Sequence, residues 1–573
     1  MKFLTLFAVL VHVALAKLDQ SWWKHTTLYE VYLPSFKDSD GDGIGDIKGL
    51  TSKLDYFMEL GIETVYISPH YLSPMEDGGY DITNFTQVNP ILGTMEDFKE
   101  LIDETKARGL KLIVDIIINH SSDKHPWFIK SVNREDPYTD FYVWRDPKSY
   151  DYNGKPIPPN NWVSIFKGSA WQWNEQRKQF YLHQFTLHQP DFNLRNNLLK
   201  TEIKKIFKFW LDKGVAGFRI DATKYLIEDA EFRDDPVKPG VIVPYTYQDV
   251  THLYTADLWE TYVFLHEIRL FCDRVTKKFT DYERILLPEA YGGGKMLYQY
   301  YGSKDYKIAH FPLNFAFVLI VEYKNASFYH NLINNYLSPI PEGGIPSWNS
   351  ENHDKFRKAM VYNPEYEYIF TTMVMLLPGV AYTYYGQEIG MIGARIRDDQ
   401  KRDSNPDDFT KTTRDSCRLP MQWDDSFNAG FSTNPKTHLP VSSEYWKINV
   451  KKQKADKNSH YYIFKRMLDL RKTDVFKYGD FKSYVVSTWV FAFTRTLKGQ
   501  GTFLVVLNLG SETEMVNLSS VIHKLPETMN VELSSPNSGY SVGDEIATSA
   551  TIPNTFILRP FGAVVLSSKM PGS

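Results

Sequence analysis

Residues 214–225 read GVAGFRIDATKY, and this stretch gives the first indication of both the fold and the chemistry. The run from residue 215 to residue 220 is almost wholly apolar, as in a strand that is buried on both faces. Arg219 and Asp221 are two residues apart at its end, a spacing that puts both side chains on one side of a strand. The arginine would favour the charged form of the carboxylate, which suits a nucleophile. A structural ion pair would give the same pattern, so the stretch alone leaves both interpretations open.

The size and charge of the chain limit the classes of protein to which it can belong. Its 573 residues, of which 43% are hydrophobic, are ample for a large core and predict about two or three domains. Lysine and arginine number 65 against 69 aspartates and glutamates, and the basic residues form no run. Nucleic acid is therefore not expected as a partner.

The N-terminus has the features of a secretory signal peptide, which we place at residues 1–16. Lys2 precedes an apolar run over residues 3–15, and alanines occupy positions 14 and 16. This run is too short to span a membrane, and no later stretch is long enough to do so. The sequence therefore predicts a secreted, extracellular protein without a membrane span.

Secretion makes cysteine pairing and glycosylation relevant. The chain has two cysteines, Cys272 and Cys417, which could pair or stay free, and the sequence does not decide between these alternatives. Asn-x-Ser/Thr triplets at Asn84, Asn325 and Asn517 are expected glycosylation sites. A fourth triplet begins at Asn119, which lies in an apolar context and is expected to stay unmodified.

Strand-like apolar runs alternate with stretches of helical periodicity over most of the chain. The strand-like runs are residues 28–33, 64–68, 111–119, 216–220, 285–288, 308–312 and 380–385, and an eighth is expected near residues 345–352. Helical periodicity is evident over residues 95–108, 199–213 and 259–279. This alternation predicts an α/β protein with a parallel (β/α)8 TIM barrel, formed by residues 17–120 and 189–477.

Two segments depart from the alternation. Residues 121–188, rich in Trp, Asn, Asp and Pro, are expected to form an inserted subdomain after the third strand. From residue 478 onward the pattern is β alone, with strands expected at residues 488–494, 502–509 and 551–566. We therefore expect an all-β C-terminal domain, a β-sandwich of residues 478–573.

Polar residues collect at the C-terminal ends of the predicted strands. They are Asp115, Asn119 and His120 after the third run, Arg219 and Asp221 after the fourth, Glu289 after the fifth, and His353 and Asp354 after the weak run near residue 350. In a TIM barrel the active site forms at that face from the ends of several strands. Carboxylates and histidines that converge there are difficult to explain as devices for stability.

Glycoside hydrolysis is the chemistry that needs this set of residues. It requires an ionised carboxylate as nucleophile and a protonated carboxyl group as general acid. Asp221, beside Arg219, suits the first role. Glu289 follows an apolar run, and desolvation raises the pKa of a carboxyl group, which suits the second role. Asp354 could stabilise the cationic sugar of the transition state.

These motifs resemble the α-amylase superfamily, glycoside hydrolase family 13, and in particular its insect-type α-glucosidase (maltase) branch. The matching motifs are DIIINH at 115–120, QPDFN at 189–193, GFRIDA at 217–222, PEAY at 288–291, NHD at 352–354, LPGVAYTYYGQEIGM at 377–391 and RLPMQWD at 418–424. They follow the order of the family through most of the chain. Each motif is weak alone, and together they are very specific.

The resemblance implies roles for individual residues. Asp221 is implied as nucleophile, Glu289 as acid/base and Asp354 as stabiliser of the transition state, with the two reacting carboxyl groups about 5 Å apart for a retaining mechanism. The implied pocket for the terminal glucose consists of Asp77, Tyr80, His120, Phe185, Arg219, His353 and Arg418. A small residue after the nucleophile, here Ala222, implies preference for α-1,4 bonds in maltose and short oligosaccharides, with sucrose a further candidate.

The loop DSDGDGIGD at residues 38–46 is a separate candidate site. Its carboxylates alternate along the loop and would repel one another without a cation. The loop begins like an EF-hand but has Gly49 where the glutamate is required. The resemblance implies one structural Ca²⁺, with Asp38, Asp40, Asp42, Asp46 and the carbonyl of Ile44 as ligands. The alternative is a solvated acidic loop.

The sequence also departs from the family pattern. Glu351 precedes NHD, where glycine is usual, Cys417 lies beside Arg418, and Leu419 replaces the common threonine. These changes concern substrate contacts and not the reaction. Two alternatives stay open: a non-catalytic relative such as an amino-acid transporter heavy chain, which carries a membrane span, and another activity of the family, such as endo-acting amylase or isomaltase.

Overall fold

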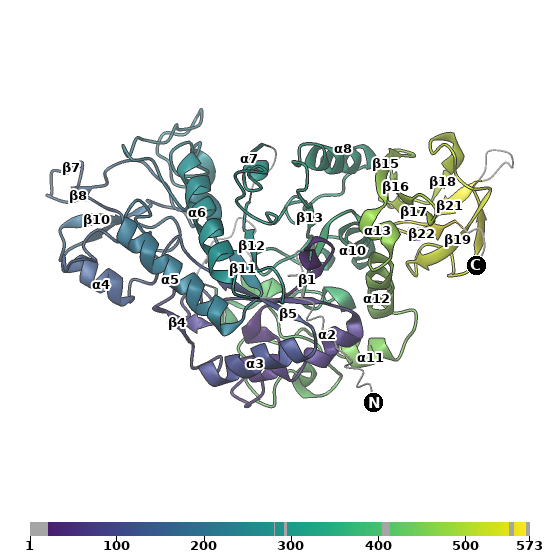
Figure 1. Cartoon of the computed structure of the whole chain (residues 1–573), viewed down its shortest axis with the longest axis horizontal. Helices are drawn as coiled ribbons and strands as arrows, with labels where there is room; N and C mark the ends of the chain where they lie inside the picture. The colour runs from purple at the N-terminus through teal and green to yellow at the C-terminus, as the bar shows by residue number, and fades with distance from the viewer. Residues whose placement is uncertain (1–20, 280, 292–294, 404–412, 549–554, 569–573) are drawn as a thin grey trace, which may run out of the picture.

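The computed structural model describes residues 21–279, 281–291, 295–403, 413–548 and 555–568, and its centre is a seven-stranded parallel sheet (Figure 1). The strands follow one another in the order β12-β11-β5-β2-β1-β14-β13. They are β1 (Thr27–Val31), β2 (Thr64–Ile67), β5 (Lys111–Ile116), β11 (Gly217–Ile220), β12 (Ile285–Pro288), β13 (Ser347–Trp348) and β14 (Val380–Tyr384). The predicted signal peptide at residues 1–16 lies outside the described residues.

The predicted strand at residues 308–312 does not form. Its segment nevertheless lies between β12 and β13, because the Leu313 N–H donates to the Pro288 carbonyl at 3.0 Å and the Ser347 hydroxyl donates to the Pro312 carbonyl at 2.7 Å. Pro312 has no N–H, so a regular hydrogen-bond ladder cannot run through it. The ring of the barrel is therefore closed by an irregular segment where the sequence predicted a strand.

Helix α5 (Asn197–Lys213) leads directly into strand β11, and the sequence sets both ends of this helix. The side chain of Asn196 accepts hydrogen bonds from the first backbone N–H groups of the helix, and Gly214, with φ 107°, ends it in the left-handed region that favours glycine. The helix buries one apolar face against the sheet, and β11 begins three residues after Gly214. The residues of that face are Leu199, Ile203, Ile206, Phe207, Trp210 and Leu211.

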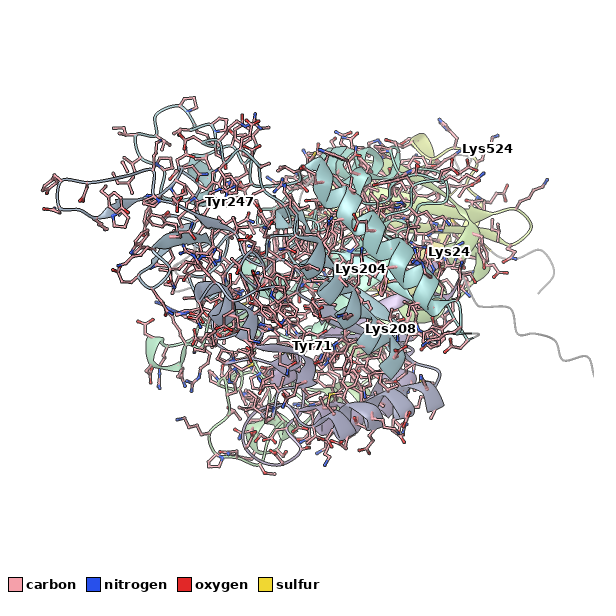
Figure 2. The ribbon with its side chains drawn as sticks, turned by 60° about the vertical axis from the view of Figure 1, so that its left-hand side comes forward. Lys24, Tyr71, Lys204, Lys208, Tyr247 and Lys524 are labelled. Carbon is pink, nitrogen blue, oxygen red and sulfur yellow. The ribbon has the colours of Figure 1, made fainter. Side chains whose placement is uncertain are left out.

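The outer surface of α5 lies beside helix α6 (Trp259–Thr276), as Figure 1 shows. Lys200 and Lys204 of α5 pair with Glu267 of α6 at 3.3 and 3.0 Å. Figure 2 shows Lys204 and Lys208, which both belong to α5. Other helices of the barrel are α1 (Ile47–Thr51), α2 (Leu54–Leu60), α3 (Met95–Ala107), α7 (Lys295–Gln299), α8 (Ala326–Leu337), α9 (Lys358–Val361), α10 (Glu367–Leu376), α11 (Val450–Lys454), α12 (His460–Arg471) and α13 (Asp474–Tyr478). Among the described residues, none of the helices combines the length and apolar character that crossing a bilayer requires.

The segment between β5 and α5 has its own small structure. It contains α4 (Pro126–Val132), the hairpin of β7 (Ser149–Tyr150) and β8 (Pro156–Ile157), and a sheet of β6 (Trp144–Arg145), β10 (Gln179–Leu182) and β9 (Trp171–Asn174). A separate apolar cluster, which includes Trp162, Trp171 and Phe180, holds this segment together. The inserted subdomain was predicted at residues 121–188, and these elements all fall between those limits.

A six-stranded antiparallel sheet forms the C-terminal part, drawn in green and yellow in Figure 1. Its strands are β15 (Asp480–Val485), β16 (Val490–Leu497), β17 (Gly501–Asn508), β22 (Ala563–Ser567), β19 (Thr528–Ser534) and β20 (Glu545–Ala547), and β18 (Glu514–Val516) pairs with β21 (Phe556–Leu558). One apolar core runs from the barrel helices into this sheet and includes Phe491 and Val565. Arg495 of β16 is buried and donates to the carbonyl of Phe476 at 2.6 Å. The all-β C-terminal domain is therefore packed tightly against the barrel.

Candidate active site

Arg219 stands at the centre of the charged groups at the carboxyl ends of the strands. It lies in β11 and points into the barrel, where Nη1 donates to both oxygens of Asp115 at 2.9 and 3.0 Å. The same nitrogen donates to Asp221 at 2.5 Å, and Nη2 lies 2.6 Å from Glu289. Both of these carboxyl groups directly follow strands, β11 and β12, that pair in parallel register. A single guanidinium therefore holds the two predicted reacting groups together.

Arg219 favours the ionised form of Asp221, as expected from the sequence, but its charge is shared with Asp115 and Glu289. Burial raises the pKa of Asp221 well above its usual range, and Glu289 adds to this effect while Arg219 opposes it. Burial also raises the pKa of Glu289, although Arg219 opposes the rise and the Ala222 N–H donates to its carboxyl at 2.8 Å. Burial that raises the pKa of two neighbouring carboxyl groups disfavours the ionisation of both at once, an arrangement that suits acid/base chemistry.

Asp354 lies in a different electrostatic environment. Burial alone would raise its pKa, but His353, Arg414 and Arg418 hold the pKa of Asp354 well below its usual range. Arg418 lies 3.1 Å and Arg414 3.3 Å from its carboxylate. His353 is fixed in turn by hydrogen bonds to Glu30 on one ring nitrogen and to Tyr80 on the other. Asp354 is therefore the carboxylate of the three that stays ionised.

Tyr80 connects the two groups of charges. Its hydroxyl donates to Asp115 at 2.9 Å and lies 2.7 Å from Nε2 of His353, and its ring stacks on the His353 ring at 5.5 Å. The Tyr66 hydroxyl also donates to Asp115, at 2.7 Å. Asp115 thus accepts hydrogen bonds from Arg219 and from two tyrosines, and in this way it orients the arginine.

A pocket of about 290 Å³ brings the predicted residues together. It is lined by Asp77, Tyr80, His120, Ile165, Phe166, Lys167, Phe185, Gln189, Asp221, Ala222, Tyr225, Tyr247, Gln248, Glu289, Tyr291, Leu319, Asp354, Lys355 and Arg414. The three carboxyl groups predicted from the sequence all line it, as do four of the predicted substrate-binding residues, Asp77, Tyr80, His120 and Phe185.

The other three predicted residues, Arg219, His353 and Arg418, stand behind the wall of the pocket and hold its carboxylates. Arg414 takes the lining position that we predicted for Arg418. It bridges Asp77, at 2.5 Å, and Asp354, at 3.3 Å. Arg414 lies four residues before Arg418, just outside the quoted motif RLPMQWD, in the short 3-10 helix Arg414–Cys417. Gln189, in the QPDFN motif, donates to Asp77 at 3.0 Å and lies 3.1 Å from His120.

Several aromatic side chains line the pocket in addition to the predicted Tyr80 and Phe185. The hydroxyls of Tyr225 and Tyr247 are 2.9 Å apart, and Phe185 packs edge-on against Tyr225 and near Phe166. Tyr247, labelled in Figure 2, comes from the long connection between β11 and α6. Aromatic walls of this kind suit the faces of sugar rings.

The acidic loop after β1 brings its first three carboxylates together. Ligand oxygens of Asp38, Asp40 and Asp42 all lie within 4.8 Å of one another. Backbone N–H groups of Gly41 and Gly43 donate to Asp38 at 2.7 and 2.9 Å and fix its orientation. Three converging carboxylates fit a hard divalent cation with oxygen ligands.

Asp46 is placed differently from the other carboxylates of this loop. It caps helix α1 through Gly49 at 2.7 Å and accepts the Ser39 N–H at 2.7 Å. It is not part of the compact cluster of Asp38, Asp40 and Asp42.

The structure also places the cysteines and the predicted glycosylation sites. Cys272 and Cys417 are both buried and both free. Asn325 and Asn517 are exposed and Asn84 is partly exposed. Asn119 is buried and donates to the Tyr225 carbonyl at 2.6 Å, in keeping with an unmodified residue.

Comparison with known proteins places this site in a family. Residues 30–479 match the model of the α-amylase catalytic domain. The chain belongs to the α-amylase family. Maltase 1 of Drosophila virilis is 41% identical to it over 557 residues, 96% of this chain and 87% of the relative. The α-glucosidase of Apis mellifera is 39% identical over 535 residues, 92% of each chain.

Two further comparisons show the range of proteins to which this chain is similar. The crystal structure of the α-glucosyl transfer enzyme XgtA has a TM-score of 0.82 and 29% identity, and covers 96% of this chain and 99% of that chain. The human amino acid transporter heavy chain SLC3A1 is 37% identical over 551 residues, 95% of this chain and 78% of the relative. The three carboxyl groups that converge in the pocket favour a catalytic member of the family here.

Proposed function

We propose that this α-glucosidase releases terminal α-1,4-linked glucose from maltose and short oligosaccharides with retention of configuration. The observation that carries the proposal is one pocket lined by Asp221, Glu289 and Asp354. The first two share the guanidinium of Arg219, whereas the third is held ionised by its neighbours. Sucrose is a further candidate substrate.

Each carboxyl group has a separate task in the proposed reaction. Asp221 attacks the anomeric carbon while Glu289 gives its proton to the leaving glycosidic oxygen, so that a glycosyl–enzyme ester forms and the aglycone departs. Water then attacks the same carbon while Glu289 takes its proton, and glucose leaves with Asp221 restored. Asp354, ionised throughout, stabilises the positive charge that develops on the ring.

The polar part of the pocket lining supports an exo-acting enzyme. Arg414 joins Asp77 to Asp354, and Gln189 joins Asp77 to His120, so a connected set of polar groups lines part of the pocket. These groups suit the hydroxyls of a terminal glucose. A longer chain could not pass through them, so cleavage inside a polymer is not expected.

Substrate assays test the proposed specificity. Ala222 directly follows Asp221 and lines the pocket, so its small side chain is expected to favour the α-1,4 bond. We expect kcat/KM for maltose to exceed that for isomaltose by about tenfold or more, about 1.4 kcal/mol in the transition state. Glucose should be the first product from maltotriose. Equal rates on the two disaccharides, or internal cleavage of starch, would contradict the assignment.

A structural Ca²⁺ in the acidic loop is part of the proposal. Asp38, Asp40 and Asp42 supply the cluster, and Asp46 and the Ile44 carbonyl are the further ligands implied by the family resemblance. The cation would neutralise carboxylates whose mutual repulsion, after burial, raises the pKa of Asp42. Its contribution would be to stability and not to the reaction.

Chelation tests the calcium site. With Ca²⁺ at one hundred times its Kd, its removal by EDTA should lower the free energy of unfolding by about 2.7 kcal/mol, measured by thermal unfolding. Addition of Ca²⁺ should restore the loss in the wild type but not in Asp40→Asn. Elemental analysis without bound calcium, or an equal response of the variant, would rule the site out.

The proposal extends to the place where the protein acts. The apolar N-terminal segment of residues 1–16 supports secretion into the extracellular space. The accessible triplets at Asn84, Asn325 and Asn517 support glycosylation there.

A further inference from the structure

The loop of residues 349–358, after β13, carries Asp354 to the pocket and His353 to a position beside it, behind the pocket wall. Its residue Glu351 stands where the family pattern has glycine, and the proposed reaction gives it no task. Glu351 is 1% exposed, and it is not one of the residues that line the pocket. A buried carboxylate is costly unless its partners are well placed, so these partners indicate what it does.

Glu351 joins the start of this loop to its end. One oxygen of its carboxyl group accepts the backbone N–H of Lys358 at 2.5 Å. The other oxygen lies 3.5 Å from Nη1 of Arg357. The two contacts hold the ends of the loop together, and His353 and Asp354 lie between these ends in the sequence. A glycine could make neither contact.

The far end of the loop is itself anchored. Arg357 is wholly buried, and its guanidinium lies 4.6 Å from the Tyr384 ring centre and 4.9 Å from that of Tyr385. Within the described residues its nitrogens have no hydrogen-bond acceptor, and Glu351 is its ion-pair partner. The Lys358 ammonium donates to the carbonyls of Val318 and Ile320 at 3.1 and 2.6 Å. Glu351 therefore links the turn that carries Asp354 to Arg357 and Lys358, which are themselves held in place by the surrounding protein.

The near end of the loop is held by a second set of contacts. Gln387 donates both to the Ser350 hydroxyl at 2.8 Å and to Glu367 of α10 at 3.0 Å. Inside the turn, the Asn352 side chain accepts the Asp354 N–H at 3.0 Å. Both ends of the loop are thus held through side-chain contacts, and Glu351 connects the two ends.

We infer that Glu351 is a positioning residue, which holds Asp354 against the sugar ring by clamping the loop through Arg357 and the Lys358 N–H. The inference rests on the proposed function of Asp354. A shift of about 1 Å in a catalytic group can cost about a hundredfold in rate. Removal of the clamp should therefore reduce interactions with a positively charged ring more than those with a neutral sugar.

Binding of two inhibitors to Glu351→Gln tests this directly. The probes are 1-deoxynojirimycin, a glucose-shaped iminosugar that is positively charged, and glucose itself, which is neutral. We expect kcat to fall about 10- to 100-fold and the Kd of the iminosugar to rise by a similar factor, with the Kd of glucose changed by less than about threefold. The matched control is Glu228→Gln, another buried carboxylate paired with an arginine, Arg195 at 3.4 Å, which should bind both probes normally.

A double-mutant cycle separates positioning from general stability. In the Asp354→Asn background, addition of Glu351→Gln should leave the iminosugar Kd unchanged, because Glu351 acts through Asp354. Loss of one charge leaves Arg357 unpaired, so Glu351→Gln/Arg357→Met is measured as well. Its melting temperature should recover while its iminosugar affinity does not.

The outcomes are distinct for the inference and for the function on which it rests. If affinity recovers with the melting temperature, or if glucose binding weakens as much as iminosugar binding, Glu351 is structural only and the inference is wrong. If the wild type binds the iminosugar and Glu351→Gln binds it equally well, the inference is also wrong. If the wild type itself binds neither probe, the proposed function fails first.

Discussion

Asp221→Asn is expected to reduce hydrolysis of maltose by about 10⁴-fold or more, because the variant cannot form the glycosyl–enzyme ester. This loss corresponds to about 5 kcal/mol of transition-state stabilisation. The fold should be unaffected, since Arg219 keeps Asp115 and Glu289 as partners. Steady-state kinetics and circular dichroism of the purified variant check both statements.

The stability of the same variant has an expected sign. The pKa of Asp221 is raised well above its usual range by burial, so its ionised form opposes folding at pH values above its unfolded pKa. A neutral asparagine removes this cost, and the melting temperature at pH 7 should equal or exceed that of the wild type. A lower melting temperature would mean that the ion pair with Arg219 outweighs desolvation.

A small external nucleophile provides the control for the role of Asp221. In Asp221→Gly the vacated space can admit azide, which attacks the anomeric carbon of α-glucosyl fluoride as fluoride leaves. The expected product is β-glucosyl azide, since azide enters from the side on which Asp221 attacks. Full activity of Asp221→Asn, or a rescued product with the α configuration, would contradict its assignment as nucleophile.

Glu289→Gln should lower the rate of the first step with maltose by about 10³-fold, within the range that general acid catalysis supplies. α-Glucosyl fluoride needs little help from an acid, so its first step should fall by about tenfold or less. Because the second step still lacks its base, fluoride should be released in a burst that precedes slow turnover. Rapid-mixing measurements of fluoride release check this.

The pH profile gives a second measure of Glu289. The limb at higher pH, where kcat/KM falls, reports loss of the proton that the Asp221–Glu289 pair holds. Burial raises the pKa of Glu289, so this limb should lie above the usual range of a carboxyl group. It should disappear with Glu289→Gln on α-glucosyl fluoride. Equal losses on both substrates, with the limb retained, would assign the acid role to another residue.

The fold was predictable wherever one local signal determines an element. The α5–β11 unit is such a case, because an Asn cap, an apolar helical face, Gly214 and a buried run follow in order. The segment at residues 308–312 shows the limit: apolar residues favour a strand, but Pro312 cannot donate to its neighbour, and the tertiary structure accepts an irregular closure.

The active site was predictable in its residue types but not in its charge distribution. Asp221 and Glu289 follow strands and could be placed at one face of a barrel. Their sharing of Arg219 with Asp115 depends on which side chains meet across strands, and sequence spacing carries no information on this. For the same reason Arg414, one turn before Arg418, was not chosen, although it is the arginine that lines the pocket.

The continuous core between barrel and C-terminal sheet has a consequence for the evolution of this chain. Phe491 and Val565 belong to the same apolar cluster as the barrel helices, and Arg495 satisfies the carbonyl of Phe476 just before the sheet begins. The family match ends at residue 479, inside this joint. A barrel that ended at residue 479 would expose apolar residues of this shared core to solvent, so we expect the barrel and the C-terminal sheet to have been inherited together.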